Sequence, residues 1–201
     1  MRLVLATRNE HKLRELGEIL AGVELVPLPA GVELPPEDGE TFADNALIKA
    51  RAAHAATGEA AIADDSGIEA RALGGRPGVR SARYAGESAG DEENLAKLLR
   101  EVDAAGTDRR VVYVCALAYV EAGGAERVFF GRCDGELARE PRGAGGFGYD
   151  PAFIPDDTGP GDERTMAELP PEAKHAISHR GRASRELGRA LGIPASAEER
   201  R

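Results

Sequence analysis

Short runs of apolar and β-branched residues alternate along the chain with segments in which apolar residues recur every three or four positions. The short runs predict strands over residues 3–6, 23–28, 60–63, 110–121 and 126–134. The spacing of three and four predicts helices over residues 11–21, 41–56, 92–102 and 171–191. Strands and helices are therefore expected to alternate through the first half of the chain, and a pair of long strands follows.

Particular residues mark the ends of several elements. Thr41 followed by Asp44 fits a capping box at the start of the second helix, and Gly58 is expected to end that helix. Gly123 and Gly124 lie between the two long strands and predict an antiparallel hairpin. Loops rich in Gly, Pro and Asp are expected over residues 29–39, 74–78, 143–150 and 156–164.

The length of 201 residues suits one domain, or two lobes that share a core. We expect a single domain with two lobes over residues 1–194 and a frayed tail over residues 195–201. A net charge of −9 argues against a broad basic surface for nucleic acid or for an anionic membrane, because such binding depends on neutralising phosphates. A polyanionic ligand would therefore have to be bound locally.

The two cysteines, Cys115 and Cys133, fall inside predicted strands and lack a metal-ligand spacing, so free thiols in a reducing compartment are expected. The N-terminus starts directly with a strand, without a signal-like apolar segment. No run of about 18 apolar residues follows. These features predict a cytoplasmic protein that does not interact with membranes.

The adjacent carboxylates of Asp64 and Asp65 are the first candidates for chemistry. They follow a predicted strand and precede Ser66 and Gly67, so they are expected in a turn at the edge of a sheet. Such an oxygen cluster suits a hard cation such as magnesium, and Glu37 in an earlier loop could supply a further oxygen. The alternative is a structural turn in which the aspartates make Asx-type hydrogen bonds.

Basic and amide side chains are candidates for phosphate binding. Lys12 lies near the start of the first helix, where free N–H groups attract anions; the alternative is an Asn9 cap with a solvated lysine. Asn45 and Lys49 are four positions apart on a helix face whose other members are alanines. They either line a cleft or belong to a solvated face.

A glycine-rich segment holds two of the few aromatic residues. Phe147 and Tyr149 are candidates for stacking on a base, and Asp150 could accept hydrogen bonds from ring nitrogens or amines. The alternative is a hairpin turn with buried aromatic residues.

Near the end of the chain, Lys174, His179 and Arg180 form either a donor set for an oxygen-rich ligand or a group of solvated helix charges. His175 and His179 are four positions apart, but no third ligand accompanies them, so a zinc site is not expected.

In the order and spacing of these groups the sequence resembles the inosine/xanthosine triphosphate pyrophosphatases, which act on non-canonical purine nucleotides. The resemblance spans nearly the whole chain. It is carried by residues 5–12 (LATRNEHK), 41–50 (TFADNALIKA), 63–67 (ADDSG), 78–86 (GVRSARYAG), 145–151 (GGFGYDP) and 178–180 (SHR).

The resemblance implies a fold and an activity. The implied fold is an elongated α/β structure in which helices flank a mixed, twisted central sheet, with two lobes, an active-site cleft between them and usually a homodimer. The implied activity is magnesium-dependent hydrolysis of ITP, dITP or XTP to the monophosphate and pyrophosphate.

The resemblance also implies roles for individual residues. Asp65 would be the proton acceptor and would lie near the metal with Glu37. Independently of the resemblance, the adjacent Asp64 is expected as a supporting metal ligand. The implied substrate-binding residues are Thr7, Arg8, Asn9, Glu10, His11, Lys12, Lys49, Ser66, Phe147, Gly148, Tyr149, Asp150, Lys174, His179 and Arg180.

The sequence departs from the family pattern at two places. Arg8 stands where the family commonly has a small residue, often glycine, and residues 156–164 form a somewhat expanded loop. Arg8 is expected either to alter the shape of the phosphate loop or to add a phosphate contact.

Two other functions stay open at this point. A regulatory protein could bind a triphosphate without cleaving it, and a related pyrophosphatase could act on pyrimidine or methylated nucleotides. Carboxylates beside a polyphosphate repel it unless a metal bridges them, which favours a hydrolase. The motifs over residues 147–150 and 178–180 favour a purine substrate.

Overall fold

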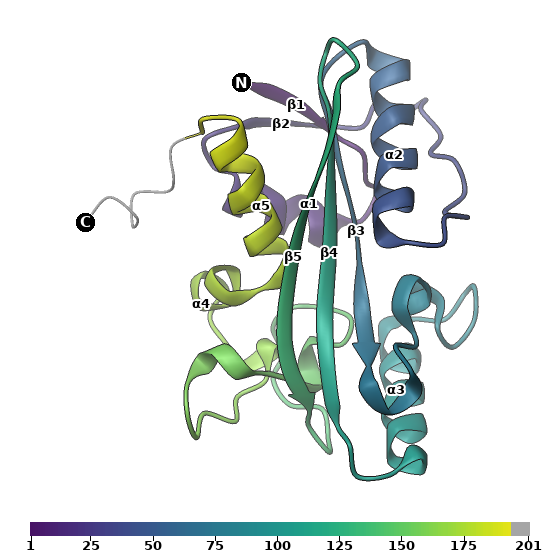
Figure 1. Cartoon of the computed structure of the whole chain (residues 1–201), viewed down its shortest axis with the longest axis vertical. Coiled ribbons are helices and arrows are strands. Elements are labelled where there is room, and N and C mark those ends of the chain that lie inside the picture. The colour runs from purple at the N-terminus through teal and green to yellow at the C-terminus, as the bar shows by residue number, and fades with distance from the viewer. Residues whose placement is uncertain (194–201) are drawn as a thin grey trace. The chain divides into compact units, whose positions relative to one another are not determined.

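The computed structural model describes residues 1–193, so the expected frayed tail over residues 195–201 lies outside it. Within this range the chain forms a six-stranded sheet in the order β2-β1-β3-β4-β5-β6, with flanking helices (Figure 1). The strands are β1 (Arg2–Leu5), β2 (Glu24–Pro27), β3 (Ala61–Ala70), β4 (Arg110–Val120), β5 (Glu126–Leu137) and β6 (Phe153–Pro155). The main helices are α1 (Glu10–Ile19), α2 (Phe42–Thr57), α3 (Asp91–Ala105), α4 (Pro171–Ile177) and α5 (His179–Ala190). Because β1 pairs in parallel with β2 and β3 while β5 and β6 are antiparallel, the expected α/β fold with a mixed sheet is confirmed.

The chain divides into two compact units, and β3, β4 and β5 each contribute to both. Unit 1 comprises Met1–Asp65, Cys115–Gly131 and the chain from Arg180 onward, and unit 2 comprises Ser66–Val114 and Arg132–His179. Each unit has its own apolar core. No helix in the described part of the chain has the length and apolar character needed to cross a bilayer.

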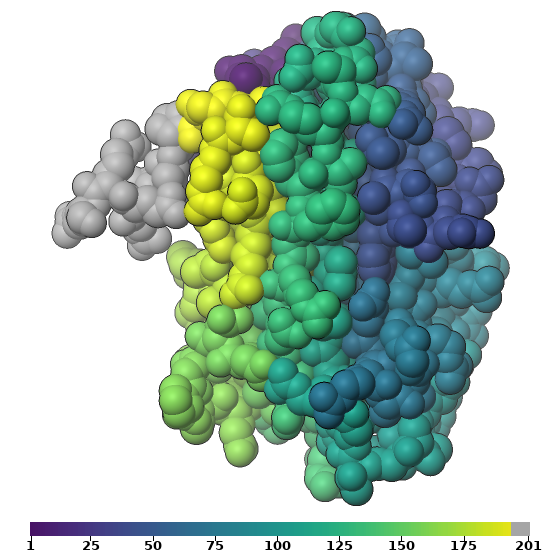
Figure 2. Space-filling model, viewed as in Figure 1, coloured from purple at the N-terminus to yellow at the C-terminus, as the bar shows by residue number. Residues whose placement is uncertain are grey.

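The core of unit 1 joins the first strands to the last helix. Its buried members are Leu3, Leu5, Leu16, Leu20, Ile62, Cys115, Leu117, Tyr119, Ala183 and Leu187. Figure 2 shows the atoms of α5 (yellow) alongside the end of the β4–β5 hairpin (green), consistent with the shared core. The core of unit 2 is built around Ile68, Leu95, Leu98, Val102, Val111, Tyr113, Phe153 and Met166.

Helix α2 begins and ends where the sequence predicts. The Thr41 hydroxyl accepts a hydrogen bond from the Asp44 backbone N–H at 3.1 Å and donates one to the Asp44 carboxylate at 2.7 Å. Gly58 ends the helix with a φ of 70°, a left-handed conformation that glycine adopts without strain. The predicted hairpin is also present, because β4 and β5 are neighbours and the Glu121 N–H donates to the Ala125 carbonyl.

The predicted turn over residues 64–67 is wrong, because β3 continues through these residues to Ala70. Two aspartates can lie inside a buried strand here because each carboxylate contacts a cationic side chain.

Gly67 lies in the same strand, at a position where close packing requires glycine. A Cβ atom at this position would lie 2.3 Å from the Ser81 hydroxyl and 2.7 Å from the Gly78 carbonyl.

The single helix predicted over residues 171–191 is also wrong, because Ser178 separates two helices, α4 and α5. Ser178 has an extended backbone with a ψ of 153°, and its N–H makes a 2.9 Å bond to the Lys174 carbonyl at the end of α4. Helix α5 then starts at His179. Serine is among the residues preferred just before a helix, and this local preference opposes the helical periodicity that continues through residue 178.

Candidate active site

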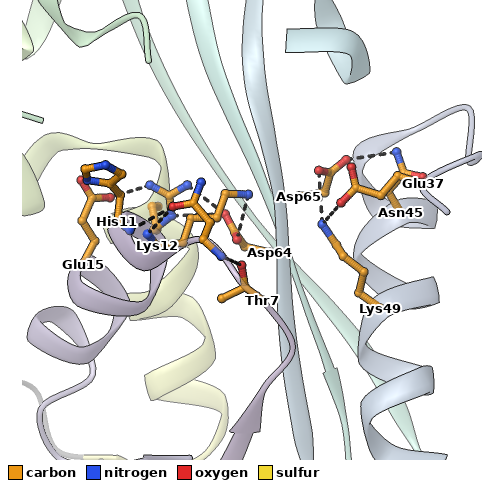
Figure 3. Close-up of polar contacts among 11 residues, drawn as sticks. Thr7, His11, Lys12, Glu15, Glu37, Asn45, Lys49, Asp64 and Asp65 are labelled. Atoms are coloured by element: carbon orange, nitrogen blue, oxygen red, sulfur yellow. Dashed lines mark hydrogen bonds and ion pairs between the residues drawn. The ribbon is translucent and has the colours of Figure 1, made fainter. Parts of the chain in front are cut away.

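Strand β3 presents two neighbouring carboxylates to opposite sides of the sheet, because successive side chains of a strand alternate. Figure 3 shows Asp64 on the side of α1 and Lys12, and Asp65 on the side of α2 and Lys49. Both side chains are buried, with exposed fractions of 1% for Asp64 and 6% for Asp65. The adjacent pair in the sequence therefore belongs to two different electrostatic environments.

Asp64 lies between two cations. The Lys12 ammonium is 3.1 Å from its Oδ1, and the Arg180 guanidinium donates to its Oδ2 from Nε at 3.2 Å and from Nη2 at 2.9 Å. Arg180 also donates from Nη1 to Glu15 at 2.5 Å. Burial acts to raise the pKa of Asp64, but Lys12 and Arg180 outweigh it and hold this pKa well below the usual range. Asp64 is therefore an ionised member of a buried ion-pair network at neutral pH.

The surroundings of Asp65 shift its pKa in the opposite direction to that of Asp64. Its Oδ2 accepts a hydrogen bond from the Asn45 amide at 3.1 Å, and its Oδ1 is 3.5 Å from the Lys49 ammonium. Burial raises the pKa of Asp65 above its ordinary value, against the opposing charge of Lys49, and the nearby Glu37 raises it further. This carboxylate consequently has a greater affinity for protons than an exposed aspartate.

Lys49 connects Asp65 to a second carboxylate. Its ammonium donates to Glu37 Oε1 at 2.5 Å as well as contacting Asp65. Burial acts to lower the pKa of Lys49, but Asp65 and Glu37 outweigh it and raise this pKa, so the lysine stays charged. Two carboxylates therefore meet at one ammonium group, on the same side of β3.

The face of α2 that carries Asn45 and Lys49 is buried, with exposed fractions of 0% and 6%, so the alternative of a solvated face is wrong. Asn45 Oδ1 accepts a hydrogen bond from the Gly39 N–H at 2.8 Å, which orients its amide toward Asp65. A Cβ atom at Gly39 would lie 2.7 Å from that oxygen, so glycine permits this close approach.

The segment over residues 7–12 is ordered by capping. Asn9 Oδ1 accepts hydrogen bonds from the N–H groups of His11 at 2.9 Å and Lys12 at 3.1 Å, so the Asn9 cap of the alternative interpretation is present. Thr7 supports it, because its hydroxyl accepts from the Asn9 N–H at 3.1 Å. The expected solvated position of Lys12 in that alternative is wrong, because its ammonium pairs with Asp64. Its neighbours Glu10 and His11 are exposed.

In unit 2, Asp150 is the centre of a buried hydrogen-bond cluster. Its Oδ2 accepts from the Lys174 ammonium at 2.7 Å and from the Phe147 N–H at 2.9 Å, and its Oδ1 accepts from the Tyr113 hydroxyl at 3.1 Å. The Lys174 ammonium also lies 5.3 Å from the centre of the Phe147 ring. Asp150 therefore fixes the positions of Lys174 and Phe147 relative to each other.

The two aromatic residues of the glycine-rich segment differ in burial. Tyr149 is 5% exposed and belongs to the core, and its hydroxyl donates to the Ser81 carbonyl at 2.7 Å, so this residue fits the alternative of a buried aromatic residue. Phe147 is half-buried, and the intervening Gly148 donates its N–H to Asp91 at 2.8 Å.

The remaining predicted residues of unit 2 are Ser66 and His179. Ser66 is half-buried on β3, and His179 is buried with its ring stacked on Tyr113 at 4.5 Å.

Three residues with contacts in these clusters, Glu15, Tyr113 and Asp91, were not predicted from the sequence. Glu15 could have been found from its spacing, because it is three positions after Lys12 and directly precedes the buried Leu16. Tyr113 and Asp91 left no comparable local signal, because each contacts the glycine-rich segment from a distant part of the chain.

Comparison with known proteins identifies relatives over almost the full length of the chain. A sequence model of the Ham1 family matches residues 3–190. The chain is 53% identical to the dITP/XTP pyrophosphatase of Frankia alni, over 95% of this chain and 97% of the relative. Its fold is similar to that of a HAM1 protein from Coxiella burnetii, with a TM-score of 0.86, 42% identity and coverage of 96% and 100% of the two chains. A dITP/XTP pyrophosphatase from Mycobacterium abscessus gives a TM-score of 0.73 at 47% identity, with coverage of 93% and 98%. The chain therefore belongs to the Ham1 family.

Proposed function

We propose that this protein hydrolyses purine nucleoside triphosphates such as ITP, dITP and XTP to the monophosphate and pyrophosphate. One observation carries the proposal: the two adjacent aspartates of β3 lie in different surroundings. Asp65 lies beside Asn45 and Lys49, whereas Asp64 lies between Lys12 and Arg180. Burial raises the pKa of Asp65, whereas the two cations hold that of Asp64 low. Carboxylates that differ in this way are typical of sites where one takes a proton and the other stays ionised. The names of the Frankia and Mycobacterium relatives agree with this activity.

In the proposed reaction Asp65 accepts a proton from a water molecule whose oxygen attacks the α-phosphorus. A new bond forms between this oxygen and phosphorus, the bond from phosphorus to the bridging oxygen breaks, and pyrophosphate leaves. The hydrogen bond from Asn45 orients the Asp65 carboxylate. Lys12 and Lys49 offset the negative charge of the substrate locally in an acidic protein.

We propose magnesium as the cofactor, with Asp65 and Glu37 as its protein ligands. The donor set fits, because magnesium commonly binds one or two carboxylates together with substrate phosphates, and these two carboxylates already meet at Lys49. Asp64 is a less suitable ligand, since its oxygens face Lys12 and Arg180. When bound, magnesium lowers the pKa of water and neutralises the departing pyrophosphate.

We propose that Phe147 and Lys174 recognise the base. The half-buried ring of Phe147 is suited to stacking, and the hydrogen bond to Asp150 holds the Lys174 ammonium beside it. The 6-oxo group of hypoxanthine or xanthine would accept a hydrogen bond from Lys174. The amine of adenine would instead face a donor, and a site built to pair with one group can reject the other by about 10⁴-fold.

The direct test is pyrophosphate release from ITP, dITP, XTP and ATP, measured with magnesium and with excess chelator. We expect release from the first three substrates only when magnesium is present, and much slower release from ATP. Binding of ITP without pyrophosphate release would favour the regulatory alternative. Equal rates for ITP and ATP would contradict the assigned base contacts.

Two further expectations are also proposals for this chain: a homodimer, implied by the family resemblance, and a cytoplasmic location, predicted from the sequence features. A homodimer can be tested by light scattering on the purified protein. The cytoplasmic location can be tested by fractionation.

A further inference from the structure

Arg8, the residue that departs from the family pattern, contacts the backbone of a second loop. Its Nη1 donates to the Leu28 carbonyl at 3.0 Å. Its Nη2 donates to the carbonyls of Pro29 at 2.8 Å and Val32 at 2.8 Å, and lies 3.4 Å from that of Ala30. One guanidinium group therefore satisfies several carbonyls of a segment that lacks a partner strand.

The geometry of this contact depends on arginine. A turn between Pro29 and Val32, closed by a 3.1 Å bond, directs neighbouring carbonyls toward one point. A planar guanidinium with five N–H donors can serve several such acceptors at once, whereas the compact ammonium of lysine cannot span them.

The contacted loop carries one of the proposed metal ligands. Residues 28–39 connect β2 to α2 without regular secondary structure (Figure 1). The far end of this loop is attached to α2, where Glu37 contacts Lys49 and Gly39 contacts Asn45. Arg8 provides the attachment at the near end.

We propose that Arg8 is a positioning residue that fixes the 28–39 loop against the segment over residues 7–12, and so holds Glu37 at Lys49 and Asp65. This inference rests on the proposed function for its catalytic consequence. It replaces the expectation of a direct phosphate contact, because the guanidinium donors are directed at the loop carbonyls.

The test compares Arg8→Lys, which keeps the charge, with Arg8→Gly, which removes it. Arg14→Lys is the matched control, because Arg14 is an exposed arginine on α1 outside the site. The first measurement is amide hydrogen exchange of the metal-free proteins. We expect both Arg8 variants to exchange about tenfold faster at Val32 and Gly39, with β1 and α1 unchanged, and the control to match wild type.

The second measurement separates metal use from nucleotide binding. We expect the magnesium concentration for half-maximal pyrophosphate release to rise about tenfold in both Arg8 variants, as for other residues that support a metal ligand. The KM for ITP at saturating magnesium should change less than twofold. A merely destabilised protein would not show this split.

Unchanged exchange of the loop in both variants would overturn the proposal. So would normal kinetics in Arg8→Lys together with a raised KM in Arg8→Gly, which would indicate a charge contact with phosphate. If the wild-type protein released no pyrophosphate, the proposed function would fail, while the exchange measurement would still decide whether Arg8 holds the loop.

Discussion

The Arg180 guanidinium and the Asp64 carboxylate form a buried ion pair, with Nε at 3.2 Å and Nη2 at 2.9 Å from the same oxygen. The exposed fractions of the two residues are 2% and 1%. Arg180 also contacts Glu15, so its charge is balanced within unit 1. These contacts favour a positioning role for Arg180, in which it fixes Asp64 and thereby Lys12. The substrate contact implied for Arg180 by the family resemblance stays a prediction.

Replacing Asp64 by Asn should strongly destabilise the protein, because Arg180 and Lys12 would then face a neutral amide in a buried site. Breaking such a pair costs about 3–5 kcal/mol of unfolding free energy. Urea denaturation measures this change. Glu126→Gln is the control, because Glu126 pairs with Arg51 at the surface and should contribute about 1 kcal/mol or less. Similar effects of the two substitutions would contradict the assigned burial of the Asp64 network.

The two aspartates should affect stability with opposite pH dependence. The pKa of Asp65 is raised on folding, so its protonated form stabilises the folded state, and this contribution is lost as pH rises from about 4 through the raised pKa. The pKa of Asp64 is lowered, so its contribution is present above about pH 4 and is lost as pH falls below that value.

The measurement is the Tm of each Asn variant relative to wild type between pH 3 and pH 8. The relative Tm of Asp65→Asn should increase with pH, whereas that of Asp64→Asn should be lowest above about pH 5 and recover in acid. Parallel curves for the two variants would show that the two carboxylates share one environment.

Activity should depend on ionised Asp65. Asp65→Asn should lower kcat by about 10²–10⁴-fold, because the amide cannot accept the proton.

In the wild-type protein, kcat/KM should fall on the acid side at a pH above about 4, the ordinary pKa of aspartate, since the free enzyme must lose the Asp65 proton. Glu37→Gln should move this fall to lower pH, because Glu37 raises the pKa of Asp65. A fall that does not move would argue against Asp65 as the titrating group.

Features with a local cause could be predicted from the sequence. The ends of α2 follow from Thr41 and Gly58, which act within one turn of the helix. The β4–β5 hairpin follows from two glycines between β-branched runs. The cap at Asn9 is similarly local.

Features that depend on distant partners could not be predicted in this way. Asp64 and Asp65 lie inside β3 because Arg180 and Lys49, which are remote in sequence, compensate their charges, and the local pattern alone indicated a turn. The greater burial of Tyr149 than of Phe147 likewise involves a distant partner, because the Tyr149 hydroxyl donates to the Ser81 carbonyl.

Asp150→Asn should weaken both stability and base binding, because Lys174 would lose its carboxylate partner in a buried site. Adding Lys174→Met should recover part of the unfolding free energy, since no unpaired charge remains, but should not restore the KM for ITP. A double-mutant cycle in denaturant, with KM measured for the same four proteins, separates the two effects. Recovery of KM in the double variant would exclude Lys174 as a base ligand.

Gly67→Ala should destabilise unit 2 by about 1–3 kcal/mol, because the added methyl group overpacks the close approach of β3 to Ser81 and Gly78. Gly17→Ala is the matched control, since a Cβ atom there meets nothing within 4 Å and alanine favours the helix by about 1 kcal/mol. Urea denaturation should therefore give changes of opposite sign for the two variants. If Gly67→Ala were neutral, β3 and the segment holding Ser81 would have to be farther apart than the structure shows, and the sequence-based turn over residues 64–67 would regain support.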